Sequence, residues 1–290
     1  MNNMKRNLVI FTAVSLSGGF MGIAVDRLNP SADPAQSIGA LIWLVSPLAA
    51  SLLLRAFAGD GWQDAGFKPH LKSSWPWYLV AFLTIPLVTL LVTGAGRMLG
   101  VINLPGFADQ GMLPFLSLAA ATFGTAMVKN VFEEFAWRGY LTPRFAALGL
   151  HPFANAALTG FVWAGWHVPY YLYFLDKEVL TAHTALSTPV FIMLAFLVLP
   201  FHALAYGELR LLSGSVWPAW LMHTIANAIS LSLISGGFMV LPRNAAGTLL
   251  SPGTEGIFSS LLMGIVGLLL YRHRQRQGRP MGQSALAASS

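Results

Sequence analysis

Two adjacent glutamates and an arginine stand inside a long apolar stretch, in residues 131–140. Charged side chains cost on the order of 2.5 to 3.5 kcal/mol each at the centre of a membrane helix, so such residues usually have a task there. On a helix, Glu134 and Arg138 lie four residues apart and can form an ion pair on one face. Glu133 points about 100° away from Glu134, and Lys129, four residues before it, can reach it. The second carboxylate favours general-base chemistry over a purely structural cluster of ion pairs.

A histidine and a histidine–asparagine pair occupy two further apolar windows. His167 lies in the aromatic-rich segment 161–169. His223 precedes Asn227 by four residues, which puts both side chains on one helical face. Taken singly, each could be a hydrogen-bonded core residue or a contact between helices. At about 1.5 Å per residue, His167 lies roughly 22 Å from the start of its helix, and Glu133 lies as far from the end of its own. His223 and Asn227 lie roughly 14 and 20 Å along theirs, so three helices supply polar groups at similar depth.

These side chains could activate water and cleave an acyl bond. Glu133 would take a proton from water, and a histidine would orient that water or carry its proton. His223 and Asn227 could donate hydrogen bonds to the oxyanion that develops during the attack. Every aspartate falls in or beside a predicted loop, and no Gly-x-Ser-Gly stretch supports a serine nucleophile.

Zinc is the alternative chemistry for the same residues. Glu133, His167 and His223 form a possible set of two histidines and one glutamate. Groups that could orient these ligands are Asn227, Glu134 and Asn130. The sequence has no His-Glu-x-x-His motif, and the positive charge of Lys129 beside Glu133 would oppose a dication. We therefore expect a site with no metal and no cofactor, with the zinc site as its rival.

The composition is that of a helical membrane protein. Of the 290 residues, 55% are hydrophobic and 10% are charged. The mean hydropathy of +0.62 excludes an ordinary soluble domain. The absence of cysteine excludes disulfides, thiolate catalysis and thiolate metal ligands. The net charge of +6 is explained by basic cytoplasmic loops, so no nucleic-acid partner is expected.

Apolar windows long enough to cross a bilayer recur along the chain. They predict an all-α integral membrane protein, a bundle of about eight transmembrane helices in a single domain, residues 1–290. The windows lie near residues 8–25, 38–57, 76–97, 113–142, 152–174, 188–206, 214–236 and 256–271. The candidate site is then buried among the fourth, fifth and seventh helices. Residues 272–290 are expected to form a basic and then disordered C-terminal tail.

The basic residues predict the orientation of the bundle. With the N-terminus in the cytoplasm, twelve of the 17 lysines and arginines fall in cytoplasmic segments and four outside, with Lys129 inside a helix. Both termini are therefore expected to be cytoplasmic, which requires an even number of helices. The two halves of the chain show no matching pair of short, Gly- or Pro-broken helices, so a transporter repeat is not indicated.

The three polar motifs, in this order, resemble those of the CPBP family of intramembrane proteases, also called the type II CAAX prenyl protease or Abi family. The family pattern is Glu-Glu-x-x-x-Arg, then an aromatic residue-x-x-x-His, then His-x-x-x-Asn. The matching residues are Glu133, Glu134, Arg138, Trp163, His167, His223 and Asn227. Trp163 stands where phenylalanine is usual. The resemblance covers residues 112–235, which we take as a CPBP-like catalytic core.

The resemblance implies an eight-helix fold and an endopeptidase that acts in the bilayer on a membrane-tethered protein or peptide. In the eukaryotic and archaeal branch, it implies removal of a C-terminal tripeptide from prenylated CAAX proteins. In bacterial members, it implies peptide processing or bacteriocin self-immunity. The family has been labelled as metalloproteases, although its structural picture fits a glutamate-activated water without a bound metal.

The resemblance also implies a role for each residue. Glu133 would be the base, braced by Glu134 and Arg138. His167 would assist the water. The oxyanion site would consist of His223 and Asn227.

We therefore predict a multi-pass protein of a bacterial-type inner or plasma membrane that hydrolyses a peptide bond through glutamate-activated water. One rival is a zinc-dependent version of the same protease. The others are a non-enzymatic bacteriocin-immunity factor or scaffold, and a transporter whose polar cluster relays protons.

Overall fold

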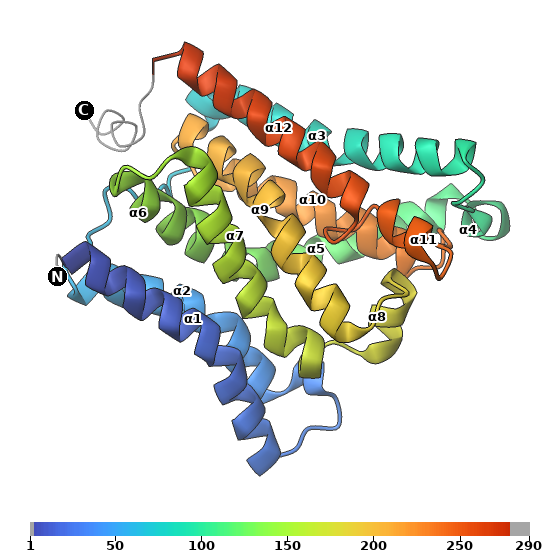
Figure 1. The fold of residues 1–290 in the computed structure, drawn as a ribbon, viewed down its shortest axis with the longest axis horizontal. Helices are drawn as coiled ribbons and strands as arrows, with labels where there is room; N and C mark the ends of the chain where they lie inside the picture. The colour runs from blue at the N-terminus through green and yellow to red at the C-terminus, as the bar shows by residue number, and fades with distance from the viewer. Residues whose placement is uncertain (1–2, 279–290) are drawn as a thin grey trace.

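The computed structural model describes residues 3–278, and regular structure in this range is almost entirely helical (Figure 1). A long helix lies over each of the eight predicted windows. These helices are α1 (Asn3–Leu28), α2 (Ile38–Phe57), α3 (Leu71–Met98), α5 (Met112–Ala136), α7 (Pro152–Pro169), α9 (Thr188–Ser213), α10 (Trp217–Ile234) and α12 (Ile257–Arg276). Extended pairing among the described residues is limited to one bridge between Asn103 and Val240.

Shorter elements fill the connections. They are the 3-10 turn η1 (Pro34–Gln36) and the helices α4 (Pro105–Asp109), α6 (Thr142–Ala147), α8 (Lys177–His183) and α11 (Ala245–Leu249). Two π-helical turns, η2 (Trp137–Leu141) and η3 (Tyr170–Phe174), continue α5 and α7.

Within the described part of the chain, five helical segments are long and apolar enough to cross a membrane by length and composition. They are α1, α2, α3, the continuous helix Met112–Ala147 and α9. The prediction of an all-α membrane protein is therefore confirmed. The total of eight membrane crossings stays a prediction.

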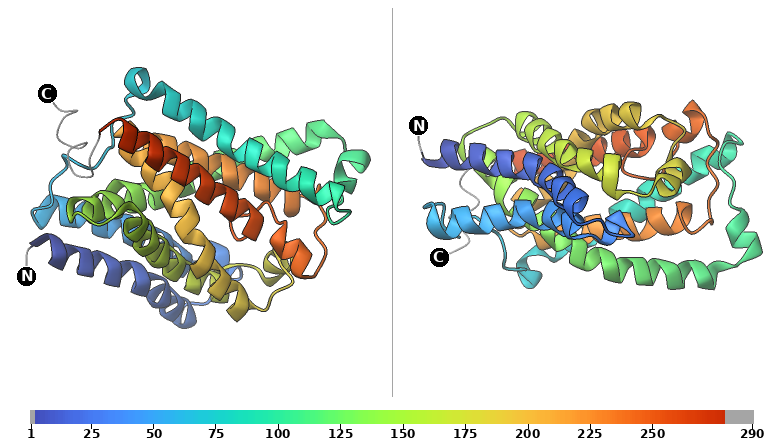
Figure 2. Two further views of the ribbon diagram at one scale, coloured as in Figure 1. Left: turned by 45° about the horizontal axis from the view of Figure 1, so that its top comes forward. Right: turned by 90° about the horizontal axis from the view of Figure 1, so that it is seen from below.

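The helices form a layered bundle (Figures 1 and 2). α1 and α2 pair along one side, and α3 and α12 run along the opposite side. Between them, α5 packs against α10, and α7 packs against α9. Gly22 of α1 faces Gly39 of α2 so closely that a Cβ on either residue would collide with the backbone carbonyl of the other. Small residues permit this close approach of two membrane helices.

The helix that carries the glutamates continues through η2 and α6 to Ala147, although Pro143 lies within it. Proline has no N–H to donate to the carbonyl four residues before it, which here belongs to Gly139. The π-helical turn therefore leaves carbonyl groups that must find other donors. These donors are arginine side chains, described with the site below.

The C-terminal end of α12 packs against α9 through a buried arginine. Arg274 is buried and binds Glu208 of α9 through Nε at 2.6 Å and Nη2 at 3.0 Å. Residues 272–276 are thus helical, and the basic segment predicted to begin the tail is in part a helix anchor. The predicted disordered end, from residue 279, lies outside the described residues.

Candidate functional site

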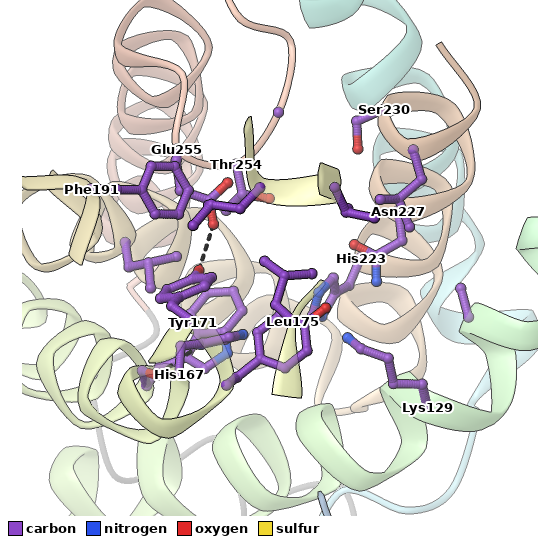
Figure 3. Close-up of a pocket in the computed structure, with 18 of the residues that line it drawn as sticks. Lys129, His167, Tyr171, Leu175, Phe191, His223, Asn227, Ser230, Thr254 and Glu255 are labelled. Atoms are coloured by element: carbon purple, nitrogen blue, oxygen red, sulfur yellow. Dashed lines mark hydrogen bonds between the residues drawn. The ribbon is translucent and has the colours of Figure 1, made fainter. Parts of the chain in front are cut away.

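The predicted site residues come from three long helices and one π-helical turn. Glu133 and Glu134 lie in the last turn of α5, and Arg138 lies in η2. His167 lies near the end of α7. His223 and Asn227 lie one turn apart on α10. His167, His223 and Asn227 line one cavity of about 320 Å³ (Figure 3). Glu133 and Glu134 lie behind its wall, paired with the lining residues Lys129 and His223.

Glu134 is the centre of a buried ion-pair cluster. Its Oε1 accepts a hydrogen bond from Arg138 Nη1 at 2.9 Å and another from His223 Nδ1 at 2.8 Å. The predicted pair of Glu134 and Arg138 is therefore present. Because the carboxylate is an acceptor, Nδ1 of His223 carries a proton. Nε2 is then the ring atom left for other partners, and His223 also lines the cavity.

Arg138 is enclosed by aromatic rings as well as by Glu134. Its guanidinium lies 4.6 Å from the ring centroid of Trp163 and 4.8 Å from that of Tyr206. Cation–π contacts of this kind stabilise a cation that has left water. Tyr206 also stacks on the ring of His223, with centroids 5.6 Å apart. The two aromatic rings thereby fix both partners of Glu134.

Glu133 is held by different partners. Lys129 Nζ pairs with its Oε1, as the spacing of four residues predicts. The indole N–H of Trp163 donates to Oε2 at 2.8 Å. The Glu133 side chain has no exposed surface, whereas that of Lys129 is 38% exposed and lines the cavity. Lys129 therefore stands between this carboxylate and the open space.

Trp163 links the two glutamate environments. Besides donating to Glu133, its ring meets the ring of His223 edge-on with centroids 5.5 Å apart. Its carbonyl accepts a hydrogen bond from Nδ1 of His167 at 2.9 Å. The motif pattern identifies Trp163 only as an aromatic residue. A buried indole N–H needs a hydrogen-bond acceptor, so a tryptophan in an apolar helix is itself an indication of a polar partner nearby.

His167 faces the cavity from the side opposite α10. Its Nδ1 donates to the Trp163 carbonyl, so a neutral ring keeps Nε2 as an acceptor. The ring stacks on Tyr171 with centroids 5.5 Å apart. Trp163 joins this histidine to Glu133, because its indole N–H donates to the Glu133 carboxylate and its carbonyl accepts from His167.

Asn227 is oriented by a second asparagine. Its Nδ2 donates to Oδ1 of Asn130 at 3.1 Å, and Asn130 Nδ2 in turn lies 3.3 Å from Thr224 Oγ1. An amide nitrogen has two protons, so one N–H of Asn227 remains for another partner. Asn130 is fully buried and joins α5 to α10. The sequence analysis considered Asn130 only as a group that could orient metal ligands.

Two buried arginines bind the free carbonyl groups of η2. Arg55 Nη2 donates to the Gly139 carbonyl at 2.6 Å, which is the group that Pro143 leaves without its helical donor. Arg210 Nε donates to the Arg138 carbonyl at 3.1 Å. Both arginines are among the twelve basic residues that the predicted topology places in cytoplasmic segments. Their burial, at 2% and 5% exposure, makes them structural supports of the turn that carries Arg138.

The loop between α2 and α3 holds these arginines in place. Asp64 pairs with Arg55 at 2.7 Å and with Arg144 at 3.1 Å, and its carbonyl accepts from Arg210 Nη2 at 2.7 Å. Asp60 accepts from the hydroxyl of Tyr140 at 2.6 Å. A loop about 70 residues before the glutamates in sequence is therefore part of the support of the site.

The side chains proposed as zinc ligands are arranged poorly for a metal. Among the described side chains, those of residues 3–181 and 184–278, no group of three or more His, Cys, Asp or Glu residues is placed to hold an ion. Glu133 is paired with an ammonium group, and His223 donates from Nδ1 to Glu134. These residues as placed do not fit a three-ligand zinc site.

A carboxylate outside the predicted set also lines the cavity. Glu255 lies in the loop between α11 and α12, and its Oε1 accepts from the hydroxyl of Tyr171 at 2.6 Å. Glu255 falls between the predicted windows 214–236 and 256–271. No helical spacing joins Glu255 to the motifs, so only the folded chain brings it to the cavity.

Comparison with known proteins supports the resemblance seen in the motifs. Residues 115–229 match the model of the family described as type II CAAX prenyl endopeptidase Rce1-like. The comparison with curated proteins finds no match to the chain. The matched segment runs from α5 into α10 and contains all six predicted site residues. Through this segment, the chain is similar to the Rce1-like family of type II CAAX prenyl endopeptidases.

Proposed function

We propose that this protein is an intramembrane endopeptidase that cleaves a membrane-associated substrate with a water molecule activated by Glu133. The observation that carries the proposal is the division between the two glutamates. Glu134 binds both Arg138 and His223, whereas Glu133 pairs with a partly exposed lysine at the cavity wall. Glu134 is thus held by two buried partners, whereas the charged partner of Glu133 is partly exposed and could give up its place to water, which makes Glu133 the candidate base.

The reaction follows from the hydrogen-bonding atoms that remain. Water that reaches the site would transfer one proton to Glu133 and keep its other O–H in a hydrogen bond to Nε2 of His167, so that its oxygen can attack a substrate carbonyl. The attack forms a C–O bond and moves the carbonyl electron pair onto oxygen. The second N–H of Asn227 donates to this oxyanion. Protonated Glu133 then returns its proton to the amine nitrogen as the C–N bond breaks.

His223 can assist the oxyanion when both of its ring nitrogens are protonated. Nδ1–H already donates to Glu134, so a second proton on Nε2 would face the developing charge. The contact of 2.8 Å with the Glu134 carboxylate fixes the orientation of this ring. Glu134 would therefore act through His223 and Arg138, without contacting the reacting atoms.

The substrate would be a protein or peptide anchored in the bilayer, with prenylated chains among the candidates. The cavity wall combines the polar groups named above with apolar side chains. The apolar members include Leu175, Leu180, Phe191, Leu199 and Leu231. Such a wall fits an apolar peptide segment or a lipid group next to the scissile bond.

We also propose that all eight long helices cross a bacterial-type inner or plasma membrane, with both termini in the cytoplasm. The start of α1 and the end of α12 lie at the same end of the bundle (Figures 1 and 2). This arrangement agrees with an even number of crossings. The basic residues near both ends agree with a cytoplasmic position.

The test is cleavage by purified protein of lipid-anchored peptides, prenylated and acylated, followed by mass spectrometry. We expect wild-type protein to release a defined fragment and Glu133→Gln to lose at least about a thousandfold in rate, within the range for general-base catalysis. The matched control is Glu178→Gln, because Glu178 is exposed on α8 and does not line the cavity. A folded wild-type protein that cleaves no peptide of the panel would support the non-enzymatic rival.

A further inference from the structure

The cavity has a second charged wall, opposite the side of Lys129. Glu255 and Thr254 lie on one side of the space, and Lys129 and His223 lie on the other (Figure 3). His167 and Tyr171 lie between them. Two charges of opposite sign therefore line one cavity. The positive one, Lys129, is paired with the motif residue Glu133, whereas the negative one, Glu255, is paired with no motif residue.

Glu255 forms no ion pair among the residues whose side chains the structure describes, 3–181 and 184–278. Its hydrogen bond comes from the neutral hydroxyl of Tyr171, at 2.6 Å to Oε1. A substrate that fills the cavity removes water from this carboxylate. The lost hydration is compensated better by a positively charged group of the substrate than by a neutral one.

The loop that carries Glu255 is fixed by serine side chains. Ser259 Oγ lies 3.1, 2.8 and 3.0 Å from the carbonyl oxygens of Ser251, Gly253 and Gly256. Ser260 Oγ donates to the Thr254 carbonyl at 2.9 Å. Both serines lie in the first turn of α12 and are buried. The carboxylate is thus held in place before any substrate binds, as a recognition group should be.

We propose that Glu255 is a specificity-determining residue that binds a cationic side chain, lysine or arginine, of the peptide substrate. This inference rests on the proposed function. The cationic side chain would lie on the Tyr171 side of the cavity while the scissile carbonyl lies beside Asn227 and His223. Tyr171 would orient the carboxylate by occupying Oε1, which leaves Oε2 for the substrate.

The experiment uses the full-length protein and a palmitoylated decapeptide of alanine and leucine that contains one lysine. The lysine is moved to each position in turn, and each peptide has a partner with neutral norleucine. Cleavage is measured as kcat/KM with wild type, Glu255→Gln and Glu255→Lys. Glutamine keeps the acceptor for Tyr171, so loss of the fold is not expected. Glu178→Gln is the matched control, since it removes an exposed carboxylate of α8.

We expect wild type to prefer lysine over norleucine at one position by about tenfold or more, as a charge-assisted hydrogen bond would give. Glu255→Gln should reduce this preference to about twofold or less, and Glu255→Lys should shift it toward glutamate at the same position. Glu178→Gln should keep the preference. Equal cleavage of lysine and norleucine peptides by wild type would overturn the proposal and leave the peptidase function intact.

Binding separates this inference from the proposed function. The same peptides are titrated against Glu133→Gln, which is not expected to cleave them, and against Glu133→Gln combined with Glu255→Gln. Tighter binding of one lysine peptide only when Glu255 is present supports the recognition site, even if wild type cleaves nothing. Equal binding of all peptides to both variants contradicts it. An amino-terminally acetylated set shows whether a free terminal amine, rather than lysine, is the group bound.

Discussion

Replacing Glu134 with glutamine tests the assignment of the two glutamates most directly. Glu134 is the ion-pair partner of Arg138, and neither side chain has exposed surface. Nε and Nη2 of Arg138 have no hydrogen-bond partner among the described residues. Removing the carboxylate would leave a buried guanidinium without a counter-charge, which costs about 3 to 5 kcal/mol.

Glu133→Gln should cost far less. Its partner Lys129 is 38% exposed, so water can solvate the ammonium group after the carboxylate is gone. Glutamine keeps an oxygen that can accept from the Trp163 indole N–H. An ion pair with one partly exposed member contributes on the order of 0 to 1 kcal/mol. The two variants should therefore differ by about 2 to 5 kcal/mol in unfolding free energy.

Thermal unfolding in detergent measures this difference. At about 2 to 4 °C per kcal/mol, Glu134→Gln should lower the Tm by on the order of 10 °C, and Glu133→Gln by no more than about 4 °C. The double variant Glu134→Gln with Arg138→Gln should recover part of the loss, because it removes the unpaired charge as well. Equal Tm values for the two single variants, with activity retained in Glu133→Gln, would refute the assignment.

Three further predictions follow from the support of the site, the topology and the metal. Arg210→Gln should lower the cleavage rate at least about tenfold and the free energy of unfolding by about 1 to 3 kcal/mol, because the Arg138 carbonyl loses its hydrogen-bond donor. Unchanged values would show that Arg210 does not support the π-helical turn. Cysteines introduced at Ser290 and Lys177 should be labelled from opposite sides of the membrane, and labelling from one side would contradict the topology. Elemental analysis of active protein should find far less than one zinc per chain. Near-stoichiometric zinc, lost with activity on chelation and restored with it, would establish the zinc-dependent rival.

Helical spacing was sufficient to predict contacts within one helix. Glu134 with Arg138, and Lys129 with Glu133, are both four residues apart and both paired. Contacts between helices were not predictable at this level. The bond from His223 to Glu134 joins residues 89 positions apart, and it depends on how α10 is rotated against α5.

The arginines show why charge counts mislead in a membrane protein. Arg55 and Arg210 lie near the ends of apolar windows, where a basic residue is ordinarily a topology signal. In the folded chain, both are buried and donate to carbonyl groups of η2. The available signal was Pro143 within a helical window, because a proline there leaves a carbonyl without its usual donor.

The geometry of the site depends on residues outside the segment that matches the family model. Residues 115–229 contain every motif residue and Arg210. Arg55 and Asp64, however, precede this segment, and they complete the binding of the π-helical turn that carries Arg138. Glu255 follows it and lines the same cavity. The polar residues of the motifs define a chemistry, but their geometry is set by a proline, two buried arginines and a loop aspartate that lie outside the motifs.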